Sequence, residues 1–254
     1  MKSPVGSIAV CYLARGAEPT ARASFGRFLA AYAAHPAGVD HDLHVLYKGF
    51  AQDAALREAR ALFGAVAHTA FDLDDLHFDI GAYIDWANRI GHDTVCMLNT
   101  ASEPCAHHWL RSLAVNLACP GVGLVGATGS FESLEDVHGD FPPFPNVHVR
   151  SNAFMIDRAR FCRLTQGLVM DDKMKTFRFE SGREGLTRRV QAEGLEVLVV
   201  GRDGRGFPPR AWPVSGTFRQ GRQENLLVAD NQTREHDQSV WLEKRAHAYR
   251  SWDR

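Results

Sequence analysis

The sequence has no long apolar run and almost no net charge. No window approaches the roughly 18 apolar residues that a helix needs to cross a bilayer. Its opening residues, MKSPVGSIAVCYLARG, lack the longer apolar stretch and the cleavage site of a signal peptide. With 29 basic and 30 acidic residues, the formal charge of -1 gives no field that would draw nucleic acid or an anionic bilayer. We therefore expect a cytoplasmic protein without nucleic-acid partners or a transmembrane segment, whose membrane contact, if any, is peripheral and on the inner face.

Cysteine is scarce, and several catalytic motifs are missing. The five cysteines are odd in number and form no CxxC pair, which favours buried free thiols in a reducing compartment over a metal or redox site. The twelve histidines show no ligand spacing, so we predict no metal-ligating residue. The absence of a GxSxG elbow and of a Walker loop disfavours hydrolases and kinases.

Short apolar runs alternate with segments of helical spacing along the chain. Its 254 residues, 45% of them hydrophobic, suffice for one sizeable core. A buried first strand is expected at 7–13, and further strands at 42–47, 65–71, 94–98, 121–126, 152–156 and 196–200. Helices are expected around residues 25–32 and at 54–63, 78–90, 107–117, 158–164 and 185–193. This order predicts an α/β fold with a twisted, mostly parallel sheet flanked by helices.

Polar residues follow the strand predicted at 94–98. Asn99, Ser102 and Glu103 stand where the strand ends, and in open α/β sheets ligands lie outside the carboxyl ends of the strands. Asn152, at the start of a later strand, joins them as a candidate binding residue. The alternative for Ser102 and Glu103 is a helix N-cap followed by a proline, and both interpretations stay open.

A second polar cluster lies in the segment FESGREGLTRR. It brings Glu180 and Glu184 to the entry of a predicted helix beside Arg183, Arg188 and Arg189. A carboxylate there could act as a base while an arginine neutralises a departing phosphate. A solvated helix with acidic residues near its positive end is the alternative.

Three further segments carry hydrogen-bonding side chains. The loop after the last strand contains Arg202 and Asp203 in a glycine-bearing turn that could hold an anion, although its GxG pattern is a weak signal. The segments 217–225 and 230–233 contain side chains of the kind that bind sugar hydroxyls. Ordinary surface loops account for them nearly as well.

The order of these elements resembles the GT-A glycosyltransferase superfamily, in particular bacterial proteins akin to inverting family 2 enzymes and rhamnan-synthesis-like transferases. Three segments carry the resemblance: FDIGAYIDWA, TVCMLNTASEP and FESGREGLTRRVQAEGLEVLVV. The first resembles the segment between the donor-binding strands and the acidic motif. The second occupies the position of the strand that ends in the DxD motif, and the third resembles the segment that holds the catalytic carboxylate.

The resemblance implies a single GT-A-like, Rossmann-like domain over residues 1–200, with residues 201–254 as an extension that packs on it. It implies transfer of a sugar from a nucleoside-diphosphate sugar to a hydroxyl acceptor in surface polysaccharide or glycan synthesis. Glu180 would then be the base, with Glu184 and Asp203 as alternatives. Asp79 and Gly81 would line the donor pocket, with Asn99 and Ser102 near the sugar diphosphate. The candidate substrate-binding arginines are Arg183, Arg188, Arg189 and Arg202.

The sequence departs from this family at two positions. The family's DxD holds a divalent cation, Mg or Mn, but Asn99-Thr100-Ala101 stands there, without a carboxylate at either outer position. Ser181 replaces the second acid of the family's paired acids. These departures leave two hypotheses: a metal-independent transferase, or a catalytically silent module that binds a nucleotide or glycan. A nucleotidyltransferase is disfavoured, because no loop after the first strand would cradle a triphosphate.

Overall fold

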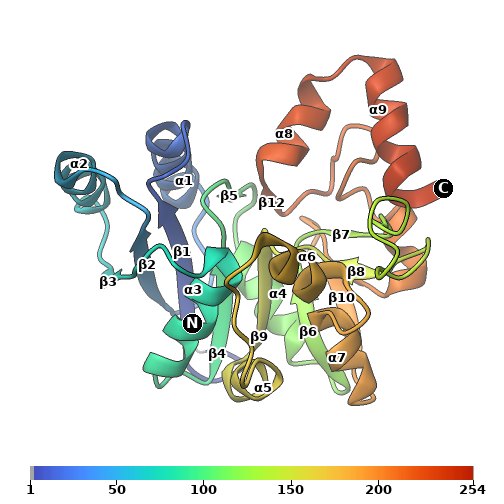
Figure 1. Ribbon diagram of the computed structural model, residues 1–254, viewed down its shortest axis with the longest axis horizontal. Coiled ribbons are helices and arrows are strands. Elements are labelled where there is room, and N and C mark those ends of the chain that lie inside the picture. The colour runs from blue at the N-terminus through green and yellow to red at the C-terminus, as the bar shows by residue number, and fades with distance from the viewer. Residues whose placement is uncertain (1–2, 254) are drawn as a thin grey trace.

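The computed structural model describes residues 3–253, which form three layers with a central sheet between two layers of helices (Figure 1). The sheet has eight strands in the order β11-β10-β6-β9-β4-β1-β2-β3. Their bounds are β1 (Ile8–Arg15), β2 (Asp42–Lys48), β3 (Thr69–Asp72), β4 (Thr94–Leu98), β6 (Val122–Gly126), β9 (Ala153–Asp157), β10 (Glu196–Val200) and β11 (Gly206–Phe207). The sheet pairs in parallel except at β9 and β11, which confirms the α/β fold with a mostly parallel sheet.

Helices cover both faces of the sheet. They are α1 (Ala21–Ala34), α2 (Asp53–Phe63), α3 (Phe78–Arg89), α4 (Trp109–Leu117), α5 (Arg158–Leu164), α6 (Lys173–Ser181) and α7 (Leu186–Ala192). The helices α8 (Asn231–Gln238) and α9 (Trp241–Ala248) stand apart from the sheet (Figure 1). One hydrophobic cluster joins the sheet to α1, α2 and α4, and a second joins the opposite face to α3, α5, α6 and α7. Because both faces are covered, strands such as β1 (IAVCYLAR) are apolar almost throughout.

The antiparallel strand β9 lies between β4 and β6 and brings its first residues to the carboxyl edge of the parallel strands. Asn99, just after β4, donates its backbone N–H to the carbonyl of Asn152 at 3.1 Å. Strand ends that are far apart in the sequence therefore meet at one edge, and this edge carries the candidate site.

Residues after 200 continue the same core. β11 pairs with β10, and β12 (Val228–Ala229) pairs with β5 (Glu103–Pro104). Trp212 in the 3₁₀ helix η1 (Pro209–Val214), Phe218, and Trp252 in the π-helical turn η2 (Tyr249–Asp253) are buried against the strands. β7 (Gly129–Ser130) and β8 (His148–Val149) form a further small antiparallel pair. Among residues 3–253, no helix is long and apolar enough to cross a membrane.

Several local expectations need correction. Glu180 lies in the last turn of α6, a helix that the apolar pattern did not predict, rather than at the entry of α7. Residues 231–233 begin α8 rather than forming a loop, and Asp230 caps that helix. The N-cap alternative for Ser102 is wrong, because the next helix begins at Trp109.

Candidate functional site

The carboxyl edge of the sheet gathers an ion pair and a buried lysine beside α3. Arg15, at the end of β1, places its guanidinium 3.6 Å from the carboxylate of Asp79 in the first turn of α3. Lys48, at the end of β2, is 2% exposed and donates to the carbonyl of Asp74 at 2.7 Å. Burial raises the pKa of Asp79, Arg15 opposes the shift, and the nearby carboxylate of Glu180 adds to it. Asp79 therefore lies within the electrostatic reach of Glu180, although α3 and α6 are far apart in the sequence.

Glu180 is half-buried, and its orientation is fixed by a hydrogen bond. The hydroxyl of Ser151, just before β9, donates to Glu180 Oε2 at 2.7 Å. His148 is buried nearby, and burial lowers its pKa while the negative charge of Glu180 opposes that shift. A carboxylate held in this way could accept a proton from a hydroxyl group brought within hydrogen-bond distance.

The turn after β4 uses its polar atoms internally. Asn99 Oδ1 accepts from the backbone N–H of Ala101 at 3.0 Å and from the hydroxyl of Ser102 at 2.9 Å. The Ser102 hydroxyl also lies 2.5 Å from the carbonyl of Asn152. The hydroxyl of Thr100 donates to the carbonyl of Leu13 at 2.8 Å, which fastens the turn to β1. The structure thus brings Asn99, Ser102 and Asn152 together.

The residues of this turn do not fit a divalent cation. Oxygen-ligated cations require carboxylates or several free carbonyl oxygens, and the amide oxygen of Asn99 is already an acceptor of two hydrogen bonds. The nearest carboxylate in sequence, Glu103, is held by the guanidiniums of Arg27 (2.8 Å) and Arg234. Within the described residues 3–253, no group of three His, Cys, Asp or Glu side chains could hold a metal ion.

Three buried polar atoms in this region have no hydrogen-bond partner: Arg15 Nε, Asp79 Oδ1 and Asn152 Nδ2. The Asn152 amide is oriented by its other end, where Oδ1 accepts from the hydroxyl of Thr128 at 2.6 Å. A buried polar group without a partner is costly, so such groups are usually satisfied by water or by a ligand. The N–H groups of Arg15 and Asn152 are therefore candidate donors to a polar ligand at this edge, whereas Asp79 Oδ1 already faces the guanidinium of Arg15 at 3.6 Å.

A cavity of about 220 Å³ adjoins this edge, lined by Lys48, Asp74, His77 and Gly81 among others. Gly81 lies within α3, where a Cβ atom would stand 2.3 Å from the Cβ of His77. Helix α3 and the preceding loop can approach this closely only with a glycine at position 81. The glycine that the sequence marked as a donor-pocket residue does line a cavity.

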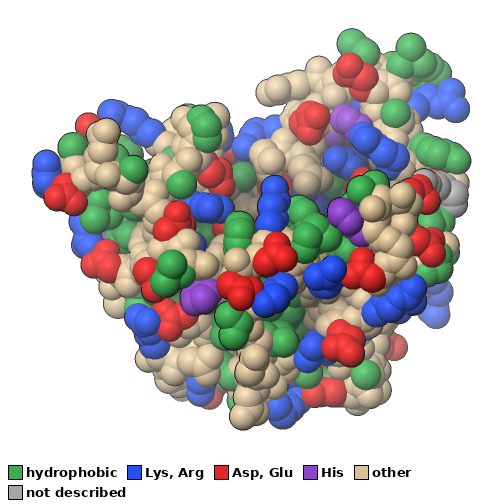
Figure 2. Space-filling model, in the orientation of Figure 1, with side chains coloured by type: hydrophobic (Ala, Val, Ile, Leu, Met, Phe, Trp, Pro, Cys, Tyr) green, Lys and Arg blue, Asp and Glu red, His purple; other side chains and the backbone are tan. Residues whose placement is uncertain are grey.

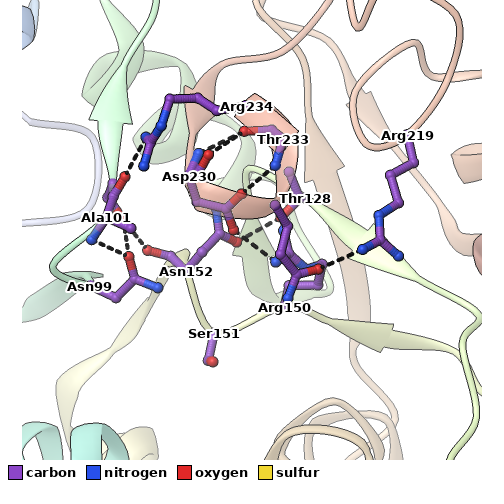
Figure 3. A network of polar contacts seen from close by, with 12 residues as sticks. Asn99, Ala101, Thr128, Arg150, Ser151, Asn152, Arg219, Asp230, Thr233 and Arg234 are labelled. Carbon is purple, nitrogen blue, oxygen red and sulfur yellow. Dashed lines mark hydrogen bonds and ion pairs between the residues drawn. The ribbon is translucent and has the colours of Figure 1, made fainter. Parts of the chain in front are cut away.

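A buried network joins the extension to the site (Figure 3). The guanidinium of Arg150 pairs with the carboxylate of Asp230 at 2.7 Å, with side chains 8% and 1% exposed. Arg150 also stacks 4.0 Å over the ring of Phe218 and bonds to Thr128, whose hydroxyl orients Asn152. The sequence did not single out Arg150.

The remaining predicted site residues lie elsewhere. Arg183, Glu184 and Arg189 line a separate cavity of about 610 Å³ beside α6 and α7, and the Glu184 side chain is 86% exposed. Arg188 donates to the side chain of Asn146 at 3.3 Å. Arg202 and Asp203 follow β10, which β6 and β9 separate from β4.

Sequence reasoning missed Arg15 and Lys48, although each lies at the end of a buried strand, as Asn99 does. The same reasoning that selected Asn99 could have found both. Tyr12, in β1, also holds the turn after β4 in place, because its hydroxyl donates to the carbonyl of Thr100 at 2.7 Å.

No protein-family model matches this sequence, and no curated protein matches it either. Solved structures do resemble its fold. A mannosyltransferase from Pyrobaculum calidifontis, in complex with GDP-Man and Mn2+, is 14% identical with a TM-score of 0.54, over 85% of this chain and 62% of its own. Mouse xyloside xylosyltransferase 1 is 10% identical with a TM-score of 0.47, over 77% of this chain and 84% of its own.

Glucosyl-3-phosphoglycerate synthase from Mycobacterium tuberculosis is 16% identical with a TM-score of 0.41, over 61% of this chain and 56% of its own. The match to the P. calidifontis mannosyltransferase covers 62% of that protein, so this chain spans less than two thirds of its length. The similarity to that mannosyltransferase shows that the chain has the GT-A fold, which agrees with the expectation from the sequence.

Proposed function

We propose that this protein is a glycosyltransferase that moves a sugar from a nucleoside-diphosphate sugar to a hydroxyl group of a glycan or related acceptor, in surface-polysaccharide or glycan synthesis. The observation that carries the proposal is the carboxylate of Glu180, held by Ser151 at the carboxyl edge of a GT-A sheet and close to Asp79. The unpartnered atoms of Arg15, Asp79 and Asn152 beside it support a polar ligand there.

In the proposed reaction, Glu180 takes the proton of the acceptor hydroxyl. The acceptor oxygen then forms a bond to the anomeric carbon of the sugar as the bond from that carbon to the diphosphate oxygen breaks. The bonding electrons leave with the diphosphate, whose charge needs neutralising. Arg15 is the guanidinium best placed for this role, because it already borders Asp79 and retains an unpartnered buried N–H.

The donor is proposed to lie along the ends of β1, β2 and β4. Asp79 and Gly81 would line its pocket, and Gly81 and Lys48 both line the cavity of about 220 Å³. Asn99 and Ser102 shape the turn beside the sugar diphosphate, and Asn152 offers its amide N–H. Arg183, Arg188, Arg189 and Arg202 remain candidates for contacts further from the reacting atoms.

We further propose that binding of the donor needs no divalent cation. The support is chemical: the oxygen of Asn99 is engaged by backbone and hydroxyl donors, and Glu103 is neutralised by two arginines. The charge of a diphosphate would instead be met by fixed cations and N–H groups of the protein.

A titration tests these proposals together. Calorimetry against UDP, GDP, CDP and dTDP sugars, each with and without EDTA, should detect one donor whose affinity is unchanged by the chelator. Arg15→Gln should weaken that donor at least tenfold, whereas Arg22→Gln, an exposed change on α1, should leave it unchanged. The proposal fails if no donor binds. A donor that binds only with Mn2+ or Mg2+ would refute metal independence alone.

The second hypothesis is a catalytically silent GT-A module that binds a nucleotide or glycan, and the absence of carboxylates at the Asn99 turn favours it. The two hypotheses agree on donor binding and differ on turnover. If a bound donor is neither transferred to any acceptor pool nor slowly hydrolysed, and Glu180→Gln changes nothing, the silent module is the correct description.

We also propose a cytoplasmic location with peripheral membrane contact. Val240, Trp241 and Leu242, at the junction of α8 and α9, are 65%, 65% and 71% exposed, and Glu243, Lys244 and Arg245 follow them in the chain. Exposed apolar side chains beside cations suit the interface of an anionic bilayer. Co-sedimentation with phosphatidylglycerol vesicles should be lost in Trp241→Ser/Leu242→Ser, and wild-type protein that stays in solution would contradict the proposal.

A further inference from the structure

A third cavity opens between the N-terminal and C-terminal parts of the molecule. It measures about 610 Å³ and lies between α1 on one side and α8 and α9 on the other. Figure 1 shows these helices standing apart with β5 and β12 between them, and in Figure 2 the surface is notched there. The volume falls within the range of cavities that hold small ligands.

The lining of this groove is rich in hydroxyl and amide groups. Thr20, Asn231, Gln238 and Ser239 contribute neutral side chains that can donate and accept hydrogen bonds. The guanidiniums of Arg27 and Arg234, which also line the groove, are both engaged by the carboxylate of Glu103. The carboxylates of Glu235 and Glu243 also line the groove and can accept hydrogen bonds from hydroxyl groups. The groove therefore offers many directional polar contacts, and its arginines are already paired with Glu103.

One lining residue carries an unsatisfied group. His247 is 7% exposed, and its Nδ1 has no hydrogen-bond partner. Burial lowers the pKa of His247, which favours the neutral ring, and a neutral imidazole can exchange a hydrogen bond with a hydroxyl. Buried polar atoms without a protein partner are usually satisfied by water or by a ligand, and His247 is one of the residues that line the groove.

Contacts link the groove to the proposed reaction centre. Arg234 donates from the wall of the groove to the carbonyl of Ala101 at 3.1 Å, in the turn after β4. The backbone of Asn99 in that turn bonds to Asn152, and the neighbouring Ser151 holds Glu180. Figure 3 shows Arg234, Ala101, Asn99, Asn152 and Ser151 along this path.

We propose that this groove binds the acceptor as a neutral, hydroxyl-rich saccharide, with the reacting sugar directed toward the Asn99 turn and Glu180. The inference rests on the proposed function for its role as acceptor, but binding of a saccharide to the groove can be measured without any donor. Amide and hydroxyl side chains discriminate among sugars by hydrogen bonds, so the groove sets which acceptor is used.

The full chain is mixed with neutral di- and trisaccharides of glucose, galactose, mannose and rhamnose, each at millimolar concentration. Saturation-transfer NMR then measures whether each saccharide binds. At least one saccharide should bind. The double variant Asn231→Ala/Gln238→Ala should weaken it about tenfold, as expected for the loss of two hydrogen bonds. The matched control is Gln191→Ala, an exposed glutamine on α7.

The outcomes separate this proposal from the proposed function. The proposal is overturned if no neutral saccharide binds, or if the double variant binds as the wild type does. Saccharide binding that is lost in the double variant, in a protein that binds no nucleotide sugar, would uphold the groove and refute the transferase. Unchanged donor affinity in the double variant would confirm that the groove and the donor pocket are distinct.

Discussion

At the scale of single residues, the site depends on two carboxylates in unlike surroundings. Asp79 faces Arg15, and burial together with the charge of Glu180 raises the pKa of Asp79. Glu180 receives a hydrogen bond from Ser151, and its negative charge opposes the lowering of the pKa of the buried His148. One carboxylate is tied to a cation and the other to a neutral hydroxyl, which suits a binding role for Asp79 and proton transfer for Glu180.

Glu180→Gln should therefore lower kcat by about 10² to 10⁴-fold, the usual contribution of a general base. The donor affinity should change little, because glutamine retains an oxygen that can accept from Ser151. Single-turnover transfer rates and donor calorimetry measure the two quantities separately.

Glu196→Gln is the matched control for this change, since Glu196 is exposed at the opposite end of the sheet. If kcat instead fell by a comparable factor in Glu184→Gln or Asp203→Asn, while Glu180→Gln stayed near the wild type, the residue changed in the inactive variant would be the general base.

Part of this residue-scale arrangement follows from position in the sequence, since Asn99 follows a buried strand and therefore lies at the carboxyl edge. Its proximity to Asn152 could not be predicted, because Asn152 precedes its strand and reaches this edge only because β9 runs antiparallel to β4. The pairing of Asp79 with Arg15 could not be predicted, because it depends on how α3 packs across the end of β1. The same limit applies to the groove residues, which lie more than 200 residues apart along the chain at Thr20 and Asn231.

At the scale of elements, the polar helix α8 was not predicted from the sequence, and contacts at its first turn stabilise it. Its sequence NQTREHDQ has no apolar face that would reveal a helix. Asp230 and Thr233 form a capping box, and the carboxylate of Asp230 also pairs with the buried Arg150. The helix α6 was missed for a similar reason, since KMKTFRFES buries only Phe179 and Ser181. The buried strands, whose burial dictates their composition, were predicted to within about two residues, whereas the strand predicted at 65–71 is the mostly exposed β3 (Thr69–Asp72).

Asp230→Asn should destabilise the protein by about 3 kcal/mol, because the buried guanidinium of Arg150 loses its counter-charge. Asparagine is itself a good N-cap, so the helix start is retained and the loss belongs mainly to the ion pair. Urea unfolding followed by tryptophan fluorescence measures the change in free energy of unfolding.

The control for the ion pair is Glu58→Gln, which breaks a pair with Arg22 whose side chains are 60% and 77% exposed. That change should cost less than about 1 kcal/mol. An Asp230→Asn variant no less stable than Glu58→Gln would show that the buried pair does not hold the extension in place.

At the scale of the whole molecule, the extension and the sheet share one core. Trp212, Phe218 and Trp252 lie in the same cluster as Val197 and Val199 of β10. We propose that residues 1–200 and 201–254 fold as a single unit, with the donor site formed by the first part and the groove shared by both. The groove then exists only when α8 and α9 are docked.

Buried histidines make the stability of this unit sensitive to acid. Burial lowers the pKa of His44 to about 4, and its Nδ1 accepts a hydrogen bond from the indole of Trp86 at 2.9 Å. Burial also lowers the pKa values of His148, His236 and His247. Each of these histidines binds a proton less readily in the folded state than in the unfolded chain. Its contribution to the free energy of unfolding is therefore fully present above about pH 6.5 and is lost as the pH falls.

The free energy of unfolding should therefore decline between pH 6.5 and about pH 4, with His44 alone contributing at most about 3 kcal/mol. Burial raises the pKa values of Asp79 and Glu18, which act in the opposite sense and reduce the decline. Urea unfolding at a series of pH values measures the slope.

His44→Gln isolates the contribution of one site, because glutamine can still accept from Trp86 but does not titrate. His44 also lies beside His92, whose ring centroid is 5.3 Å away, and near Asp42, so the variant removes one charge from a small cluster. Its stability should fall less steeply with acid than that of the wild type. Parallel pH profiles for the two proteins would mean that His44 binds its proton in the folded state as readily as in the unfolded chain. The acid sensitivity would then originate at the other histidines, including His247 in the wall of the groove.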